Sequence, residues 1–293
     1  MQQVTPQSNF LKIKLPHLPE VQLHYLTYGN PALTPVFCVH GLSCNAYDFD
    51  FLARVLAQDY YVIAIDVVGR GLSSHFDNKD FYTNDNHLAL CIELLSHLRI
   101  TQPVHWVGSS MGGIMGMMAC FLYPDKIRSL MLNDVGAVLA KEGLAEIMQY
   151  LSNKLPIGDN AKFEAAYRAQ NEANFGLQNE AHWQHFFRSR IYTDELGIWR
   201  LRGDFGVLKP MRELIGENPQ DISLEALWLA VKCPVLIFRG ENSQLLRHDD
   251  AVNMQNRNDI LVELHEIAGV GHMPSLIPQA QTSIIHNWLL GKC

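Results

Sequence analysis

The chain has 293 residues, of which 48% are hydrophobic and 18% are charged. This composition excludes global disorder and is typical of a folded globular protein. Its formal net charge of −7 argues against nucleic acid or an anionic membrane as a partner, because both attract basic surfaces.

Targeting and cysteine patterns limit the setting in which the protein acts. The first ten residues are polar and lack the basic and apolar regions of a secretory signal. The most apolar run, residues 104–123, contains His105 and several glycines, so we expect no membrane span. The six cysteines are dispersed without a CxxC pair, which favours reduced thiols over disulfides. We therefore expect a cytoplasmic protein.

Short apolar runs alternate with helical stretches over the first half of the chain. The apolar runs predict strands at residues 10–15, 21–28, 36–40, 61–66, 104–109 and 127–133. The spacing of apolar residues predicts helices at residues 47–58, 84–98 and 111–123. Near-continuous apolar strands separated by helices favour a parallel sheet that is covered on both faces.

The alternation stops after about residue 136. From there to residue 228 the pattern is helical without a convincing strand, and it predicts helices at residues 143–151, 161–174, 180–189 and 195–202. Strand patterns resume at residues 235–239 and 261–267, with helices at 249–255 and 279–290. We therefore expect an α/β core formed by residues 1–135 and 229–293, interrupted by a helical insertion at residues 136–228.

One segment, Gly108-Ser109-Ser110-Met111-Gly112, fits the pattern GxSxG between a predicted strand and a predicted helix. In that setting a sharp turn holds the central serine, here Ser110, in a strained conformation above the sheet. The flanking glycines let the strand and the helix approach each other. The backbone amide of Met111 then points from the helix amino terminus toward developing negative charge. The pattern predicts a nucleophilic serine rather than an ordinary glycine–serine turn.

Two further segments fit the same chemistry. His40-Gly41 ends an earlier predicted strand, and in such enzymes the loop after that strand supplies the second amide of the oxyanion hole, for which we select Leu42. A hydroxyl is a weak nucleophile and needs an adjacent base. Among the 13 histidines, His272 stands in a glycine-bounded loop after the last predicted strand, at the edge where ligands bind in such sheets. We predict that His272 is the base.

Together these segments resemble the α/β-hydrolase superfamily, in the form that has a serine nucleophile and a helical cap. The resemblance covers about residues 10–290 and includes the segment from Asp66 to Ser73, which is similar to the family's DxxGxGxS. It implies an α/β-hydrolase fold, with a mostly parallel eight-stranded sheet, an antiparallel start, helices on both faces and a cap insertion. It also implies hydrolysis through an acyl-enzyme that needs neither a metal nor an organic cofactor.

The triad also needs a carboxylate that orients the imidazole, and here the sequence departs from the family pattern. The usual turn after the seventh strand has Ser243 or Gln244 in place of the acid. Asp134 follows the neighbouring strand in Leu-Asn-Asp-Val-Gly, which resembles family members that carry the acid there. We select Asp134, with Glu241 as the alternative. A dyad and a purely structural carboxylate at Asp134 also remain open.

The resemblance favours a small carboxylic ester as substrate, with an amide or a lactone also open. Relatives that cleave carbon–halogen bonds or epoxides use Asp where this chain has Ser110. A second reading is carbon–carbon bond hydrolysis of a dienoate, but such relatives often have Asn and Trp where this chain has Ser109 and Met273. A third is a non-catalytic protein that only binds a small molecule.

The aromatic and charged side chains of the predicted cap give information on the substrate. Most of the aromatic residues of the cap should form its core, and a minority should line a pocket for a small-molecule substrate with an apolar portion: Trp183, Phe186, Phe187, Tyr192, Trp199 and Phe205. The dienoate reading would need one of its arginines to bind the substrate carboxylate: Arg188, Arg190, Arg200 or Arg202. His182 and His185 are three residues apart without an evident third ligand, so we expect no metal.

Overall fold

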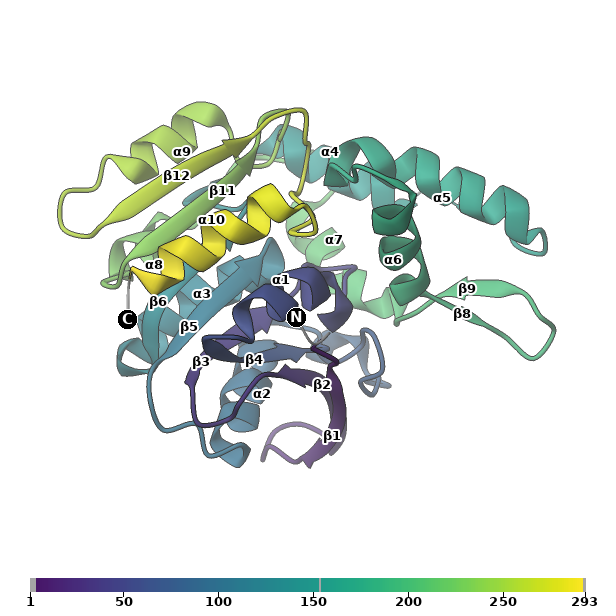
Figure 1. Ribbon diagram of the computed structural model, residues 1–293. Helices are drawn as coiled ribbons and strands as arrows, with labels where there is room; N and C mark the ends of the chain where they lie inside the picture. Colours follow the sequence, from purple (N-terminus) through teal and green to yellow (C-terminus); the bar gives the residue numbers. More distant parts are fainter. Residues whose placement is uncertain (1–3, 153, 292–293) are drawn as a thin grey trace.

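The computed structural model describes residues 4–152 and 154–291. Its centre is an eight-stranded sheet with helices on both sides (Figure 1). In spatial order the strands are β1 (Gln7–Ile13), β2 (Val21–Tyr28), β4 (Tyr60–Ile65), β3 (Thr34–Val39), β5 (Val104–Ser109), β6 (Ile127–Asn133), β11 (Val235–Gly240) and β12 (Val262–Ile267). Strand β2 pairs antiparallel with β1 and β4, and the other pairs are parallel. The expected mostly parallel sheet with an antiparallel start is confirmed.

The sheet separates two apolar layers, because successive side chains of a strand point to opposite faces. In β3, Phe37 and Val39 enter one layer, whereas Val36 and Cys38 enter the other. The first layer is covered by α2 (Asn84–His97), α3 (Met111–Leu122), α8 (Glu225–Ala230) and α9 (His248–Gln255). The second layer is covered by α1 (Asp50–Leu56) and α10 (Gln279–Leu290).

Between β6 and β11 the chain leaves the sheet and forms an inserted segment, residues 138–230, whose distal helices lie beside the sheet (Figure 1). Before α8 it contains α4 (Lys141–Ser152), α5 (Asn160–Phe175), α6 (Glu180–Arg190) and α7 (Lys209–Ile215). Trp183, Phe186 and Phe187 of α6 pack on Phe163 and Tyr167 of α5. This aromatic core holds the two helices together.

The described part of the inserted segment also contains four short strands, although the sequence pattern predicted none there. They form two antiparallel pairs: β7 (Val138–Leu139) with β10 (Ile222–Ser223), and β8 (Ile191–Thr193) with β9 (Trp199–Leu201). Strands of two or three residues are too short to give a detectable alternation of apolar side chains.

The helix predicted at residues 195–202 is wrong, because these residues form the turn and second strand of the β8–β9 hairpin. The Asp194 carboxylate accepts hydrogen bonds from the amides of Leu196 and Ile198, and Gly197 has φ +77°. This turn chemistry outweighs the weak helical spacing of the apolar residues. The hairpin projects from the body of the molecule in Figure 1.

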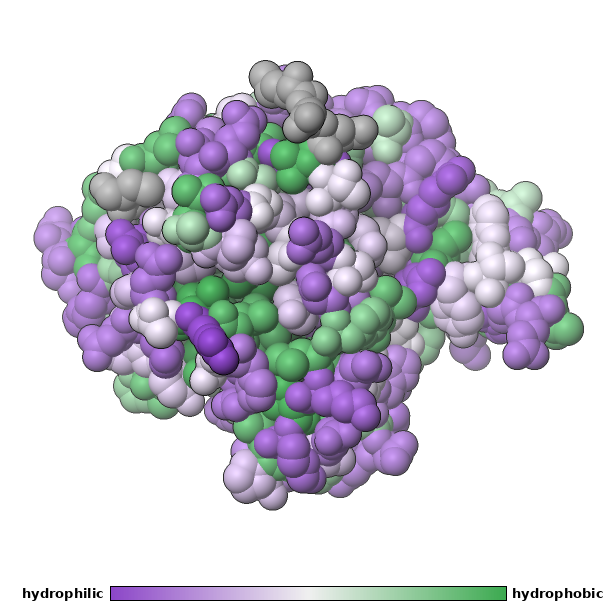
Figure 2. Space-filling model, turned by 60° about the horizontal axis from the view of Figure 1, so that its bottom comes forward, coloured by the Kyte–Doolittle hydropathy of each residue, from purple (hydrophilic) through white to green (hydrophobic). Residues whose placement is uncertain are grey.

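Short 3₁₀ turns join several elements: η1 (Ala46–Phe49), η2 (Lys79–Phe81), η3 (Pro124–Lys126) and η4 (Phe205–Leu208). Polar side chains dominate the edges of the face in Figure 2, and apolar side chains are exposed in its middle. Of the helices in the described ranges, none has the length and apolar character that crossing a bilayer requires.

Candidate active site

Ser110 lies at the tight turn between β5 and α3, where the GxSxG pattern predicts it. Its backbone has φ +48° and ψ −113°, a region that residues other than glycine rarely occupy. A Cβ atom added to Gly112 would lie 1.9 Å from the carbonyl oxygen of Val39, and one added to Gly108 would lie 2.3 Å from that of Gly112. Glycine at both positions therefore lets the helix begin directly after the strand, with the serine at the carboxyl edge of the sheet.

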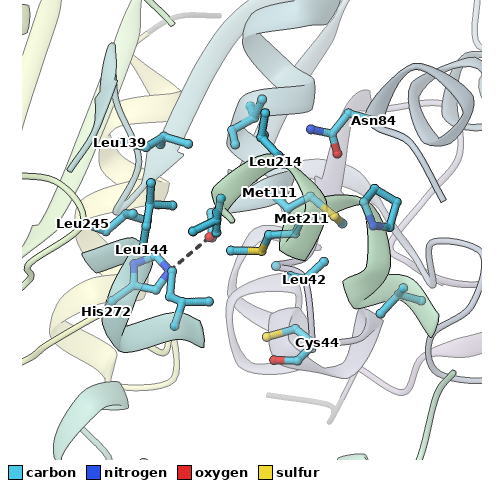
Figure 3. Close-up of a pocket in the computed structure, with 18 of the residues that line it drawn as sticks. Leu42, Cys44, Asn84, Met111, Leu139, Leu144, Met211, Leu214, Leu245 and His272 are labelled. Carbon is cyan, nitrogen blue, oxygen red and sulfur yellow. Dashed lines mark hydrogen bonds between the residues drawn. The ribbon is translucent and has the colours of Figure 1, made fainter. Parts of the chain in front are cut away.

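Three of the predicted residues meet at this edge. Nε2 of His272 lies 3.0 Å from Oγ of Ser110 (dashed line in Figure 3), and Nδ1 of His272 lies 2.6 Å from Oδ2 of Asp134. His272 follows β12 and Asp134 directly follows β6, so parallel strands that end at the same edge bring them together. The Asp134 side chain is fully buried, whereas the His272 side chain is partly exposed.

Strand β11 and the loop after it hold the Asp134 carboxylate. The amide of Gly240 donates to Oδ1 of Asp134 at 2.8 Å, and the Ser243 hydroxyl donates to Oδ2 at 2.6 Å. The amide of Asp134 donates to the carbonyl of Phe238 at 2.8 Å. These contacts maintain the left-handed backbone of Asp134, which has φ +56°. An ionised carboxylate can accept from Gly240, Ser243 and His272 together, since its two oxygens offer about four acceptor sites.

The sequence left open whether Asp134 or Glu241 contacts the imidazole, and the two residues differ in the structure. Glu241 is exposed and accepts a hydrogen bond from the amide of Gly269 at 2.7 Å, whereas Asp134 contacts His272. In the sequence Ser243 is notable only because it replaces the usual acid, yet its hydroxyl contacts the carboxylate of Asp134. Its position in the turn after β11 is the one signal in the sequence that could have indicated this contact.

Leu42 and Met111, the predicted oxyanion residues, line the same cavity as Ser110. A Cβ atom added to Gly41 would lie 3.6 Å from Cβ of Ser110, so the loop before Leu42 passes close to the serine. Within the described ranges, neither the Leu42 nor the Met111 amide donates to a backbone carbonyl. Met111 is the first residue of α3, where an amide has no acceptor in its own helix. Neither amide is therefore committed to a backbone acceptor among the described residues.

His40 stabilises the loop that carries Leu42. Its Nδ1 atom donates to the carbonyl of Gly41 at 2.7 Å, and its Nε2 atom accepts from the amide of Val67 at 3.0 Å. Complete burial lowers the pKa of His40 to about 4, so the ring is neutral at pH 7 with its proton on Nδ1. His40 thus joins the loops after β3 and β4.

The serine opens into a cavity of about 390 Å³, a size suited to a small molecule. Its wall is mainly apolar and combines the core with the inserted segment (Figure 3). The core supplies Leu42, Met111, Ile114, Leu245 and Met273, and the segment supplies Leu139, Leu144, Ile147, Met211 and Leu214. Because the segment forms part of the wall, its packing on the core determines the shape of the cavity.

The aromatic residues named for the cap lie elsewhere. Trp183, Phe186 and Phe187 are buried in the small core of the inserted segment, and Tyr192 and Phe205 are exposed. None of the six lines the described wall of the serine cavity, whereas Phe175 does.

The structure does not bring a cap arginine to Ser110. Arg190 forms a buried ion pair with Asp48 at 2.6 Å and lies 3.7 Å from the centre of the Phe186 ring. Arg200 pairs with Asp194 at 3.0 Å. None of the four arginines, including Arg188 and Arg202, is among the described residues that line the serine cavity.

The histidine pair and the cysteines form no metal site in the part of the chain that the structure describes, where no group of His, Cys, Asp and Glu could hold a metal ion. His185 instead donates from Nε2 to the carbonyl of Tyr47 at 2.9 Å. The sulfur atoms of Cys120 and Cys233 lie 3.9 Å apart as free thiols.

A second serine–histidine–aspartate contact occurs outside the described wall of the serine cavity. Oγ of Ser8 lies 2.9 Å from Nε2 of His24, whose Nδ1 lies 2.7 Å from Oδ2 of Asp66. Here the aspartate also accepts from the amides of Ala46 and Leu72, and Ser8 is on the edge strand β1 rather than at a helix amino terminus. This arrangement joins strands β1 and β2 to η1 and to the loop after β4. It offers a matched control for Ser110.

Comparisons with known proteins agree with this architecture. The sequence profile of the alpha/beta hydrolase family matches residues 36–282. The 3-hydroxybutyrate-oligomer hydrolase of Cupriavidus necator is 32% identical over 281 residues, which cover 92% of this chain and 93% of that protein. An X-ray structure from Rickettsia typhi is 28% identical, with a TM-score of 0.88 and coverage of 98% and 100%. An alpha/beta hydrolase from Novosphingobium aromaticivorans is 25% identical, with a TM-score of 0.85 and coverage of 99% and 100%. The chain is a hydrolase that belongs to the alpha/beta hydrolase family.

Proposed function

We propose that the protein is a serine esterase in which Ser110, His272 and Asp134 form the catalytic triad. The observation that carries the proposal is the pair of contacts at His272, 3.0 Å to Ser110 and 2.6 Å to Asp134. In the first step the Ser110 oxygen attacks the ester carbonyl while its proton passes to Nε2 of His272. Asp134 orients the ring and stabilises the imidazolium that forms.

The remaining steps use the same groups. The amides of Leu42 and Met111 donate to the oxyanion of the tetrahedral intermediate. The carbon–oxygen bond to the alcohol then breaks, His272 returns its proton to the leaving alcohol, and the acyl group stays on Ser110. A water molecule then attacks the carbonyl of this acyl group while it gives a proton to His272. The bond from that carbonyl to the Ser110 oxygen breaks, His272 returns the proton to Ser110, and the acid is released.

In this proposal residues 136–228 act as a cap. Leu139, Leu144, Ile147, Met211 and Leu214 of this region form part of the cavity wall. An apolar wall excludes water from the apolar part of a substrate and strengthens the polar contacts at the reacting carbonyl.

We propose a short ester of a hydroxy acid as the substrate class. The relative from Cupriavidus necator supports this choice, because it is named for 3-hydroxybutyrate oligomers and matches this chain over nearly the whole length of both proteins. The mainly apolar cavity of about 390 Å³ suits a short chain with methyl branches. We select the linear dimer of 3-hydroxybutyrate as the first substrate to test.

The other two readings have weaker support. Carbon–carbon bond hydrolysis of a dienoate was expected to use a cap arginine for the substrate carboxylate, but none of the four lines the described cavity wall. Ser109 and Met273 also stand where such relatives often have Asn and Trp. A non-catalytic binding protein needs no contact between Ser110 and His272. Binding alone therefore gives no reason for the geometry at His272.

The test is covalent labelling by a fluorophosphonate, followed by intact-mass measurement. Wild-type protein should gain one label, and Ser110→Ala should gain none, because only an activated serine attacks phosphorus rapidly. Ser8→Ala is the matched control, since Ser8 also contacts a histidine, and it should label like the wild type. If Ser110→Ala still labels, or if wild type is labelled neither by this probe nor by a smaller one, the proposal is wrong.

A further inference from the structure

Arg70 is a buried cation in the wall of the serine cavity. It follows β4, its side chain is 2% exposed, and it lines the cavity together with Ser110. Within the described ranges it forms no ion pair with a carboxylate; its partners there are neutral atoms. A buried arginine normally has an acidic partner, because an unpaired charge away from water is strongly unfavourable.

The donors of Arg70 are only partly used. Its Nε atom donates to the carbonyl of Leu42 at 3.0 Å, and Nη1 donates to the carbonyl of Val68 at 2.9 Å and to Nε2 of His87 at 3.1 Å. Its Nη2 atom has only the sulfur of Met111 at 3.3 Å, a weak acceptor. Since the guanidinium has five N–H groups, Nη2 retains a donor beside the two oxyanion residues.

His87 adds a second unused donor to the same wall. It is buried, lines the cavity, and accepts from Arg70 through Nε2. Burial and the Arg70 charge hold the pKa of His87 well below its usual range, so the ring is neutral and its proton is on Nδ1. In the described structure this Nδ1 atom has no hydrogen-bond partner.

The acids around Arg70 do not neutralise it. Asp204 is engaged by the Tyr82 hydroxyl at 2.7 Å and by the ammonium group of Lys79. Asp85 and Glu146 also line the cavity, but both are exposed and their charge is screened by water. Burial lowers the pKa of Arg70 to about 10, which still leaves the guanidinium charged at pH 7.

We infer that Arg70 binds a free carboxylate of the substrate, so that the enzyme selects esters with an acid end. This inference rests on the proposed esterase function and narrows it to acid-terminated hydroxy-acid esters. The carboxylate would supply the missing counter-ion and accept from Nη2 of Arg70, while the neutral ring of His87 holds the guanidinium through Nε2. A neutral ester would leave the charge and this donor unpaired, which is a strong basis for discrimination.

The experiment compares two dimers of 3-hydroxybutyrate, one with a free carboxylate and one with the isosteric carboxamide. Cleavage of the single ester bond is followed by chromatography. Wild type should favour the acid by about 10- to 100-fold in kcat/KM, the range for a hydrogen bond to a charged group. Arg70→Met should reduce this ratio to about one, and Arg70→Lys should retain part of it because the charge remains. Arg200→Met, which removes an arginine outside the described cavity wall, should keep the wild-type ratio.

Arg70 also donates a hydrogen bond to the Leu42 carbonyl. The experiment must therefore distinguish carboxylate binding by Arg70 from a purely structural role in this loop. Loss of that role would lower kcat/KM for both dimers equally, and an unchanged ratio in Arg70→Met would overturn the inference. If Arg70→Met does not fold, the wild-type protein still decides: 3-hydroxybutanoate should inhibit hydrolysis of 4-nitrophenyl butyrate about 10-fold more strongly than 3-hydroxybutanamide. Equal inhibition, or equal cleavage of the dimers by wild type, contradicts the inference while leaving the esterase intact. If none of the three esters is cleaved, the proposed function itself fails, and the inference with it.

Discussion

The hydroxyl of Ser243 donates a 2.6 Å hydrogen bond to Oδ2 of Asp134, the same oxygen that lies 2.6 Å from Nδ1 of His272. Ser243 stands where the family usually places the acid, and Asp134 stands at the end of the adjacent strand. The two positions thus face each other across the carboxyl ends of β6 and β11, and a carboxylate at either one would be near the imidazole.

Removal of the Asp134 charge tests the assignment of the acid. Asp134→Asn should lower kcat on the order of ten-thousand-fold, because an amide stabilises neither the required tautomer nor the imidazolium. Glu241→Gln is the control, since Glu241 contacts the amide of Gly269 instead, and its kcat should stay within about twofold of wild type. Ester hydrolysis and fluorophosphonate labelling rates measure both variants. The opposite ranking would identify Glu241 as the acid.

Moving the acid to the usual position should restore activity. In the double variant Asp134→Asn/Ser243→Asp, the carboxylate of residue 243 would lie where the Ser243 hydroxyl contacts Asp134 in the wild type. From there it should reach Nδ1 of His272. We expect this double variant to regain on the order of tenfold to a hundredfold in kcat over Asp134→Asn alone. The single variant Ser243→Asp, with two buried carboxylates in contact, should lose stability. No recovery in the double variant would mean that the position of residue 243 does not allow contact with the imidazole.

The tight turn at Ser110 should not tolerate a methyl group. Gly112→Ala would place Cβ 1.9 Å from the backbone oxygen of Val39, so the free energy of unfolding should fall by about 3 kcal/mol, the upper end for overpacking. Gly291→Ala is the control, because its Cβ would meet nothing closer than 3.4 Å, and it should change stability by less than about 0.5 kcal/mol. Urea unfolding followed by tryptophan fluorescence measures both. Similar stabilities would contradict the close approach of α3 and β3.

Buried histidines should make the fold sensitive to mild acid. Burial lowers the pKa of His40 and of His105 to about 4, below the ordinary value of 6.5. Between pH 6.5 and 4 these histidines are therefore protonated in the unfolded chain but not in the folded chain. Their contribution to the free energy of unfolding is complete above pH 6.5 and is lost as the pH falls toward 4. Each histidine adds a slope of at most about 1.4 kcal/mol per pH unit. Unfolding in urea at pH 7, 6 and 5 should show a smaller slope for His105→Gln, and the same slope as wild type for the exposed control His75→Gln. Equal slopes in all three proteins would contradict the prediction.

Local patterns predicted the elements whose signals lie within one segment. The strands β2, β5 and β6 and the helix α10 have the bounds that their apolar patterns predicted. The turn at Ser110 was predictable because its glycines, its strand and its helix are contiguous. The β8–β9 hairpin was not, since its turn depends on side-chain contacts of Asp194 that compete with helical spacing.

Contacts between distant segments were harder to predict. His272 could be selected from its glycine-bounded loop, and Asp134 from a resemblance to a family. The contact of Ser243 with Asp134, however, joins residues 109 positions apart. Arg70 was visible only as part of the segment from Asp66 to Ser73, and only the dienoate reading needed a cation, which it sought among the cap arginines. Its burial and the absence of an acidic partner among the described residues are tertiary properties, which no local pattern encodes.

The position of Asp134 in the chain has a consequence for chimeras in which two family members exchange their inserted segments. Asp134 lies between β6 and β7, at the root of the inserted segment, whose Ala140 and Gly143 amides donate to the carbonyls of Leu245 and Gln244. In the proposed triad the acid is therefore transferred with the insertion in any chimera joined at the end of β6. Grafting an insertion from a relative with its acid after β11 would then leave this core without an acid, and the reverse graft would give two acids. A functional exchange would have to begin at Val135, one residue further along the chain.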